Sequence, residues 1–129
     1  MQEDNMEAIL EKSNLSKTQV VTKALFNLKR ELGLSNEIVG QIIGADPATV
    51  SRMQKKMDMK QNKVYESAVL IIRVYRSLYA ILGGSTDAMQ HWLNTKNLDF
   101  DQRTPLDKMK TIVGLVNVVE YLDAMRGHA

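Results

Sequence analysis

Apolar residues recur along most of the chain at spacings of three and four, which is the period of an amphipathic helix. The first predicted helix covers residues 16–32, with apolar positions at Val20 or Val21, Ala24 or Leu25, Leu28 and Leu32. The longest covers residues 62–82 and repeats Val64, Ala68, Ile71, Tyr75, Leu78 and Leu82, with Val69, Ile72 and Tyr79 beside them. A stripe this broad predicts burial on more than one side.

Shorter helices are predicted after Gly83-Gly84, which ends the long helix. Residues 85–94 carry Met89, Trp92 and Leu93, residues 94–102 form a polar loop, and Thr104-Pro105 begins a short turn of helix to residue 109. Thr111 caps a last helix over residues 112–126, with faces marked by Val113, Val116, Val119 or Glu120, and Leu122 or Met125. No alternating strand pattern with turns at both ends is present, so the predicted fold is all-α.

Residues 34–56 are typical of two short helices joined by a tight turn. Ser35 is a good N-cap for the first helix, and Gly44 suits a left-handed residue at its end. Asp46-Pro47 then begins the second helix, because proline loses nothing at the first helical position. Gly40 in mid-helix is expected to allow a close approach of backbones, since glycine otherwise costs about 1 kcal/mol there.

The second of these helices presents a polar, basic surface of the kind that enters a DNA major groove. Its outward positions are Ala48, Thr49, Ser51, Arg52, Lys55 and Lys56. We expect Thr49, Ser51 and Arg52 to contact base edges. Asn36, Lys55 and Lys56 are the candidates for phosphate contacts.

The net charge of +2 is unevenly distributed. Residues 1–15 form an acidic arm with four acids and one base, and we assign it no function. Residues 16–63 hold nine bases and four acids, whereas residues 64–129 hold seven of each. The positive charge therefore coincides with the helix-turn-helix pattern, which favours DNA binding over a merely solvated basic surface.

The composition favours a cytoplasmic binding protein. There is no cysteine for a disulfide or a thiolate metal site, and no apolar run reaches the roughly 20 residues of a membrane span. The two histidines, His91 and His128, are far apart, and no phosphate-binding loop or nucleophile elbow appears. We therefore expect no catalysis, no cofactor, no metal and no membrane partner.

Two resemblances point to one family. The run Thr49-Val50-Ser51-Arg52 resembles the DNA-binding helix of Xre-like repressors. The C-terminal half resembles the toxin-binding domain of Xre/MbcA/ParS antitoxins in Trp92-Leu93, Asn97, Arg103-Thr104-Pro105-Leu106 and Gly114. The sequence differs from that family at Lys96, where proline is common, and at Phe100-Asp101-Gln102, which replaces a glycine-containing stretch. The implied organisation is an arm (1–15), a helix-turn-helix region (16–63), a long connecting helix (64–82) and a toxin-binding lobe (83–129).

The resemblance also implies partners. Family members pair with a RES-type toxin that consumes NAD, block its cleft with the C-terminal lobe, and repress the promoter of the pair. Carried onto this chain, the implied toxin contacts are Trp92, Asn97, Arg103, Thr104, Pro105, Met125, Arg126 and His128.

Other interpretations remain open from the sequence. Trp92, Pro105 and Leu106 also suit the core and cap of a small lobe. The chain also fits a helix-turn-helix regulator without a toxin partner, or an interaction module that no longer binds DNA. One helix-turn-helix makes few DNA contacts, so we expect a homodimer on a palindrome, with the broad face of the long helix as candidate dimer surface. Arg73 and Arg76, set within that face, are expected to extend to solvent.

Overall fold

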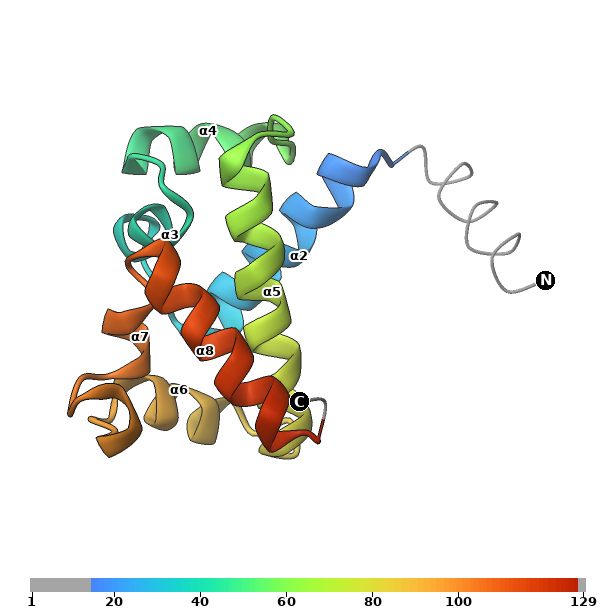
Figure 1. The fold of residues 1–129 in the computed structure, drawn as a ribbon. Helices are drawn as coiled ribbons and strands as arrows, with labels where there is room; N and C mark the ends of the chain where they lie inside the picture. Colours follow the sequence, from blue (N-terminus) through green and yellow to red (C-terminus); the bar gives the residue numbers. More distant parts are fainter. Residues whose placement is uncertain (1–14, 128–129) are drawn as a thin grey trace.

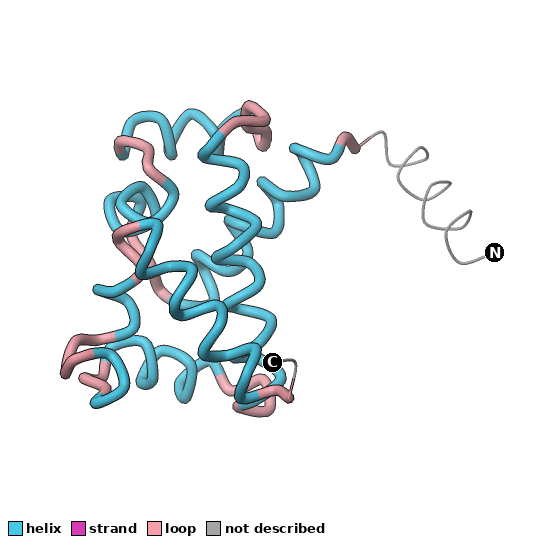
Figure 2. The backbone as a smooth tube through the Cα atoms, viewed as in Figure 1, coloured by secondary structure: helices cyan, strands magenta, loops and turns pink. Residues whose placement is uncertain are grey.

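The computed structural model describes residues 15–127, so most of the predicted arm, and the candidate contact His128, lie outside the described residues. Figures 1 and 2 show the arrangement of the helices. In chain order the elements are α2 (Lys17–Leu32), α3 (Asn36–Ile43), α4 (Pro47–Lys56), α5 (Lys63–Ile81), α6 (Thr86–Asn94), the 3-10 turn η1 (Leu98–Phe100), α7 (Pro105–Lys108) and α8 (Ile112–Met125). No strand occurs between residues 15 and 127, which confirms the all-α prediction.

Each α-helix begins at a side chain that accepts a hydrogen bond from an otherwise free backbone amide of the first turn. The caps predicted at four helices are present: Ser35 accepts from Ile38, Asp46 from Thr49, Thr104 from Asp107 and Thr111 from Gly114. At α6 the sequence allows Ser85, Thr86 or Asp87 as the cap, and the structure has Ser85, which accepts from Ala88. Local chemistry therefore fixes where the helices start.

The long helix α5 is the centre of the fold (Figure 1). It packs against α2 and α3 and also against α6 and α8, burying Ala68, Ile71, Val74 and Leu78. The expected burial on more than one side is thus confirmed. The chain's own helices cover most of this face, so little of it is left as the dimer surface that the sequence suggested. Val69 and Tyr79 do not widen the buried stripe: they are 40% and 52% exposed.

The rotation of α8 differs from the prediction. Its buried residues are Gly114, Leu115, Val118, Val119 and Leu122, whereas Val113 is 69% exposed. The reason lies at the first turn, where a Cβ built on Gly114 would be 1.8 Å from the backbone oxygen of Lys108. Only glycine allows α8 to approach the end of α7 so closely, and this approach sets which face turns inward.

A salt bridge ties α8 to α5 along their exposed edge. The guanidinium of Arg73 pairs with the carboxylate of Asp123. Arg73 does extend to the surface as expected, but its charge is used between two helices of the same chain. Arg76 is exposed.

Two further properties concern the described part of the chain. No helix between residues 15 and 127 combines the length and apolar composition that a bilayer crossing requires. Over the same residues, no group of three or more His, Asp or Glu side chains gathers closely enough to hold a metal ion.

Candidate functional site

The turn between α3 and α4 has the geometry that its glycines require. Gly44 adopts the left-handed conformation with φ 79°, as predicted. A Cβ on Gly40 would lie 2.2 Å from the backbone oxygen of Ala45, so the close approach expected at Gly40 is made by the turn itself. Val39 and Val50 are buried between the two helices, which leaves the opposite side of α4 free.

The outer side of α4 presents most of the predicted DNA-binding residues. Ala48, Arg52, Lys55 and Lys56 are exposed, and Thr49 and Ser51 are half-buried. Arg52 Nη2 donates a hydrogen bond to Thr49 Oγ1 at 2.9 Å, which orders the guanidinium along the helix. Asn36 lies apart on α3, and its Oδ1 atom is buried without a hydrogen-bond partner in the described chain.

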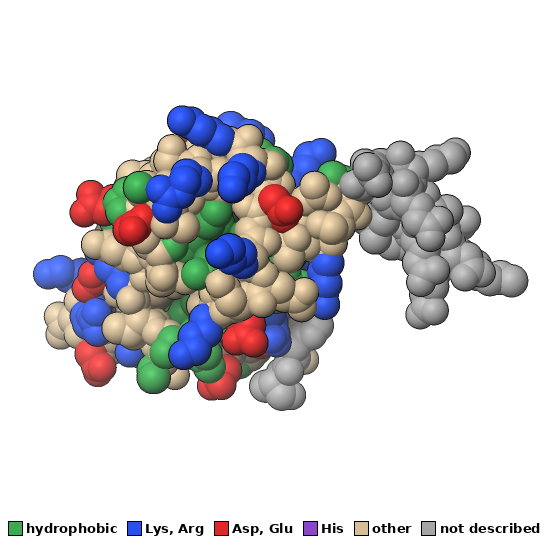
Figure 3. All heavy atoms as spheres, turned by 90° about the horizontal axis from the view of Figure 1, so that it is seen from above, with side chains coloured by type: hydrophobic (Ala, Val, Ile, Leu, Met, Phe, Trp, Pro, Cys, Tyr) green, Lys and Arg blue, Asp and Glu red, His purple; other side chains and the backbone are tan. Residues whose placement is uncertain are grey.

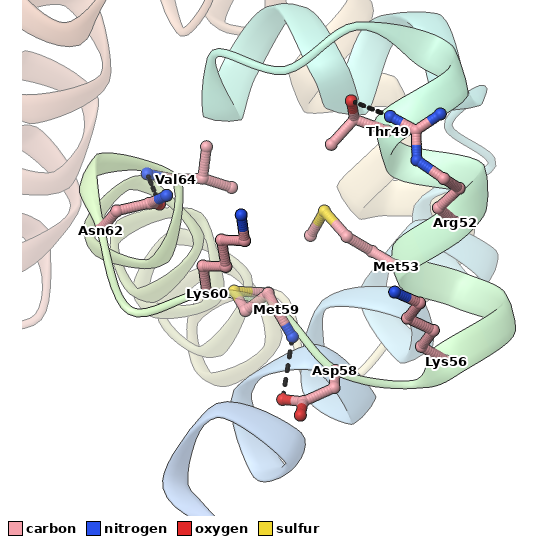
Figure 4. Close-up of a pocket in the computed structure, with 9 residues that line it drawn as sticks. All are labelled: Thr49, Arg52, Met53, Lys56, Asp58, Met59, Lys60, Asn62 and Val64. Atoms are coloured by element: carbon pink, nitrogen blue, oxygen red, sulfur yellow. Dashed lines mark hydrogen bonds between the residues drawn. The ribbon is translucent and has the colours of Figure 1, made fainter.

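A basic groove runs between α4 and the start of α5, with a volume of about 570 Å³ (Figure 4). Thr49, Arg52 and Lys56 line it from α4, and Lys60 and Asn62 line it from the connecting segment. Met53, Met59, Val64 and one acidic residue, Asp58, complete the lining, and the two methionines are buried. Viewed from above in Figure 3, lysine and arginine side chains surround a patch of apolar atoms on this end of the molecule.

Lys60 and Asn62 were not predicted as site residues. Residues 58–61 are mostly polar, and nothing in their pattern indicates that the segment folds back toward α4. The burial of Met59, at 8% exposure, is what brings the segment there. The only sequence feature that could have indicated Lys60 as a site residue is its charge, because it lies in the basic region, residues 16–63.

One acidic group stands at the start of α4. The hydrogen bond from the Thr49 amide holds the pKa of Asp46 below its usual range, and the Arg52 charge adds to this in a smaller way. Asp46 therefore stays ionised as the helix cap at neutral pH. A fixed negative charge beside Thr49 also limits how closely phosphate can approach the first turn of α4.

The opposite end of α5 carries a closed loop, residues 97–103. Asn97 and Arg103 form an isolated antiparallel bridge, in which the Asn97 amide donates to the Arg103 oxygen at 3.0 Å. Asn97 Oδ1 also accepts from the Asp99 amide and so caps η1. Asp101 and Gln102 both have positive φ, at 55° and 60°, which is the conformation that glycine adopts most easily.

An aromatic cluster supports this loop from inside. Phe100 is 3% exposed and lies edge-on to Tyr121 of α8, with ring centroids 4.9 Å apart. Trp92 of α6 stacks on Tyr121 at 6.3 Å. The Tyr121 hydroxyl donates to Asp99 Oδ2 at 2.9 Å, which joins α8 to η1. The half-buried Trp92 therefore belongs to the packing of this lobe.

The hydrogen bond from Tyr121 to Asp99 predicts how the Tyr121 hydroxyl titrates. Together with burial, donation to Asp99 raises the pKa of Tyr121 above its ordinary value of 10.0. The interaction is therefore fully present below pH ~10 and is lost as the pH rises through the raised pKa. In phenolate absorbance titrations, the component that Tyr121→Phe removes is expected to ionise above pH ~10. A component at or below that pH would contradict the hydrogen bond.

The predicted toxin contacts fall into two groups. Asn97 and Arg103 are the two ends of the closed loop, Thr104 follows it, and Trp92 lies against its Phe100, whereas Met125 and Arg126 lie at the end of α8. Arg103 is exposed and forms a salt bridge to Asp107 at 3.3 Å. Arg126 Nη1 donates to Ser77 Oγ of α5 at 3.1 Å. Pro105 is the first residue of α7, and because it is buried it is not a surface contact in this structure.

A second open groove, of about 520 Å³, lies between the end of α5 and α6. It is lined by Leu82, Asp87, Ala88, His91, Trp92, Thr95, Lys96 and Asn97. Its position beside the loop extends the candidate contact surface toward α6.

Comparison with known families identifies both the N-terminal and the C-terminal part of the chain. Residues 13–73 match the antitoxin Xre-like helix-turn-helix domain. Residues 77–127 match the antitoxin Xre/MbcA/ParS C-terminal toxin-binding domain. Among curated proteins, no match was found.

The protein is therefore an antitoxin that combines a helix-turn-helix domain with a toxin-binding domain. The chain belongs to the Xre/MbcA/ParS-type antitoxins, as its sequence motifs indicated. Its two domain matches imply a toxin and DNA as partners.

Proposed function

We propose that this antitoxin neutralises a RES-type, NAD-consuming toxin by blocking its active-site cleft, and represses its own promoter through α4. The observation that supports both roles is the placement of the two domains along α5 (Figure 1). The basic groove lies at the start of this 19-residue helix and the closed loop follows its end. At 1.5 Å per residue the helix spans about 28 Å, so DNA and toxin can occupy one molecule together.

For DNA binding we propose the division made above, with residues 16–63 as the binding region and 64–82 as the connector. Thr49, Ser51 and Arg52 are the proposed base contacts, and Lys55, Lys56 and Lys60 are the proposed phosphate contacts. A single α4 covers few base pairs, so we propose a homodimer on a palindrome with half-sites about 34 Å apart.

For toxin binding we propose the surface formed by Trp92, Arg103 and the loop, with Met125 and Arg126 at its edge. Arg103 is suited to meet a toxin carboxylate. In this structure Arg103 pairs with Asp107, and the two side chains are 48% and 50% exposed. Exposed ion pairs of this kind contribute little stability. Exchanging Asp107 for a toxin carboxylate therefore costs little.

Co-expression with the product of the neighbouring gene tests the proposal. We expect a toxin that depletes cellular NAD, and we expect the antitoxin to restore growth and NAD. Point variants are preferable to deletion of residues 83–129, because deletion would strip α8 from α5. Arg52→Ala should retain the rescue of growth while losing promoter repression.

Arg103→Ala should weaken the rescue while retaining repression. Absence of any growth rescue by the wild-type chain would leave the alternative function, a dimeric helix-turn-helix regulator without a toxin. We propose a cytoplasmic location, because both proposed partners, DNA and a toxin that consumes NAD, act there.

A further inference from the structure

We propose that Leu98 is the apolar anchor by which this antitoxin enters a pocket on its toxin. This inference rests on the toxin-binding role proposed above. The Leu98 side chain is 82% exposed, more than any other large apolar residue in residues 15–127. It lies within the domain match that is described as toxin-binding, residues 77–127. A single exposed leucine is common on a protein surface, so Leu98 is distinguished by the way the chain holds it.

The loop that carries Leu98 is closed by its own backbone. The amides of Phe100 and Gln102 both donate to the Asn97 oxygen at 3.0 Å. The Arg103 amide donates to the Phe100 oxygen at 3.0 Å, and the Asn97–Arg103 bridge closes the base. These bonds leave the loop little freedom to fold Leu98 onto the protein.

Side chains on both sides of Leu98 fix the loop to the lobe. Phe100, two residues on, is buried against the Tyr121 ring. Asp99, the next residue, accepts the Tyr121 hydroxyl. The side chains of Asn97 and Asp99, on either side of Leu98, are both held by hydrogen bonds. The Leu98 side chain has no such contact and extends into solvent.

The backbone also shows that the loop is constrained. Asp101 and Gln102 occupy the left-handed region, which non-glycine residues adopt at a cost and keep only where surrounding contacts enforce it. A preordered loop loses little conformational entropy on binding, so an apolar side chain on it contributes most of its burial to affinity. The loop therefore suits insertion into a preformed pocket.

In this geometry, the residues that resemble the family have mainly structural roles in the loop. Asn97 and Thr104 cap η1 and α7, Pro105 is buried, and Arg103 closes the loop. Their caps and backbone bonds shape the loop, the exposed Arg103 side chain remains available for a toxin carboxylate, and Leu98 between them supplies the apolar contact. Asp101 of the same loop is also exposed, so the pocket on the toxin should be apolar with a basic group at its rim.

Affinity measurements with the purified toxin from the neighbouring gene test this assignment. Leu98→Ala should weaken binding about ten- to a hundredfold, because the burial of most of an isobutyl group is lost. Leu98→Met, which keeps apolar volume, should bind within about threefold of wild type. Val69→Ala on α5 is the matched control and should bind as wild type, since Val69 is exposed outside the toxin-binding match.

Because Leu98 is exposed, its variants should keep the wild-type unfolding midpoint, so reduced binding cannot reflect misfolding. Wild-type affinity in Leu98→Ala, with wild type itself binding tightly, would overturn the anchor while leaving the proposed function intact. Failure of wild type to bind would overturn the proposed function and the anchor with it.

Thiol labelling gives a second readout, since the chain contains no cysteine. A maleimide should label Leu98→Cys rapidly in the free antitoxin and much more slowly in the complex, as read from the antitoxin's mass. Val69→Cys should label at the same rate in both states. Equal labelling of position 98 with and without toxin would show that the toxin does not cover the loop.

Discussion

Replacing Gly114 by alanine is expected to lower the free energy of unfolding by about 3 kcal/mol, the upper part of the usual range for overpacked sites. In an ordinary helical site the same change would stabilise the protein by about 1 kcal/mol, because alanine favours helix. The sign of the effect therefore tests the packing of α8 directly.

The expected loss follows from two contacts. The added Cβ would lie 1.8 Å from the Lys108 oxygen and 2.8 Å from its carbonyl carbon. Both atoms belong to backbone at the end of α7, so no side-chain rotation relieves the overlap. The Gly114 amide also donates to the Thr111 cap at 3.1 Å, and movement of the helix start would break that bond.

Urea unfolding followed by circular dichroism measures this effect. Val113→Ala is the matched control, since it changes the preceding residue, which is 69% exposed. We expect that variant to stay within about 0.5 kcal/mol of wild type, as surface changes usually do. A Gly114→Ala protein as stable as wild type would show that α8 does not approach α7 as described.

Replacing Arg52 by alanine is expected to reduce affinity for the operator by about 1–3 kcal/mol, or about five- to 160-fold, and to relax specificity at one base position. Arg52 is exposed on α4 and is held by Thr49 at 2.9 Å. A preordered guanidinium can donate two hydrogen bonds to one guanine edge. Fluorescence anisotropy with the promoter and with shuffled DNA separates specific from general binding.

Two variants show whether the loss is specific to Arg52. Lys60→Ala, across the groove, should weaken binding to both DNAs alike and reduce the salt slope by about one, as a phosphate contact does. Arg76→Ala removes an exposed charge far along α5 and should change little. Equal losses for Arg52→Ala and Arg76→Ala would mean that Arg52 contributes only net charge.

Local signals in the sequence predicted the helices well. Ser35, Asp46, Thr104 and Thr111 each begin a helix as expected. Gly44 ends α3 in the left-handed conformation. These features depend on bonds within four residues, so short stretches of sequence carry them completely.

The candidate sites were less predictable, because they form between segments distant in sequence. Lys60 joins the basic groove only because Met59 is buried beneath it. Leu98 is exposed because Phe100 and Asp99 are held by Tyr121, more than twenty residues away. The residues resembling the family lie in and around this loop, but resemblance alone did not distinguish those that shape it from one that extends from it.

The sequence by itself determined the helical class, the helix starts, the basic character of residues 16–63 and the two-part family signature. Only the tertiary structure decided which face of α8 turns inward, what covers α5 and which loop residue faces solvent. Periodicity defines a stripe on a helix, but a broad stripe allows several rotations. The close approach of Gly114 to the Lys108 oxygen selects one of them, and such a contact exists only once the helices have packed.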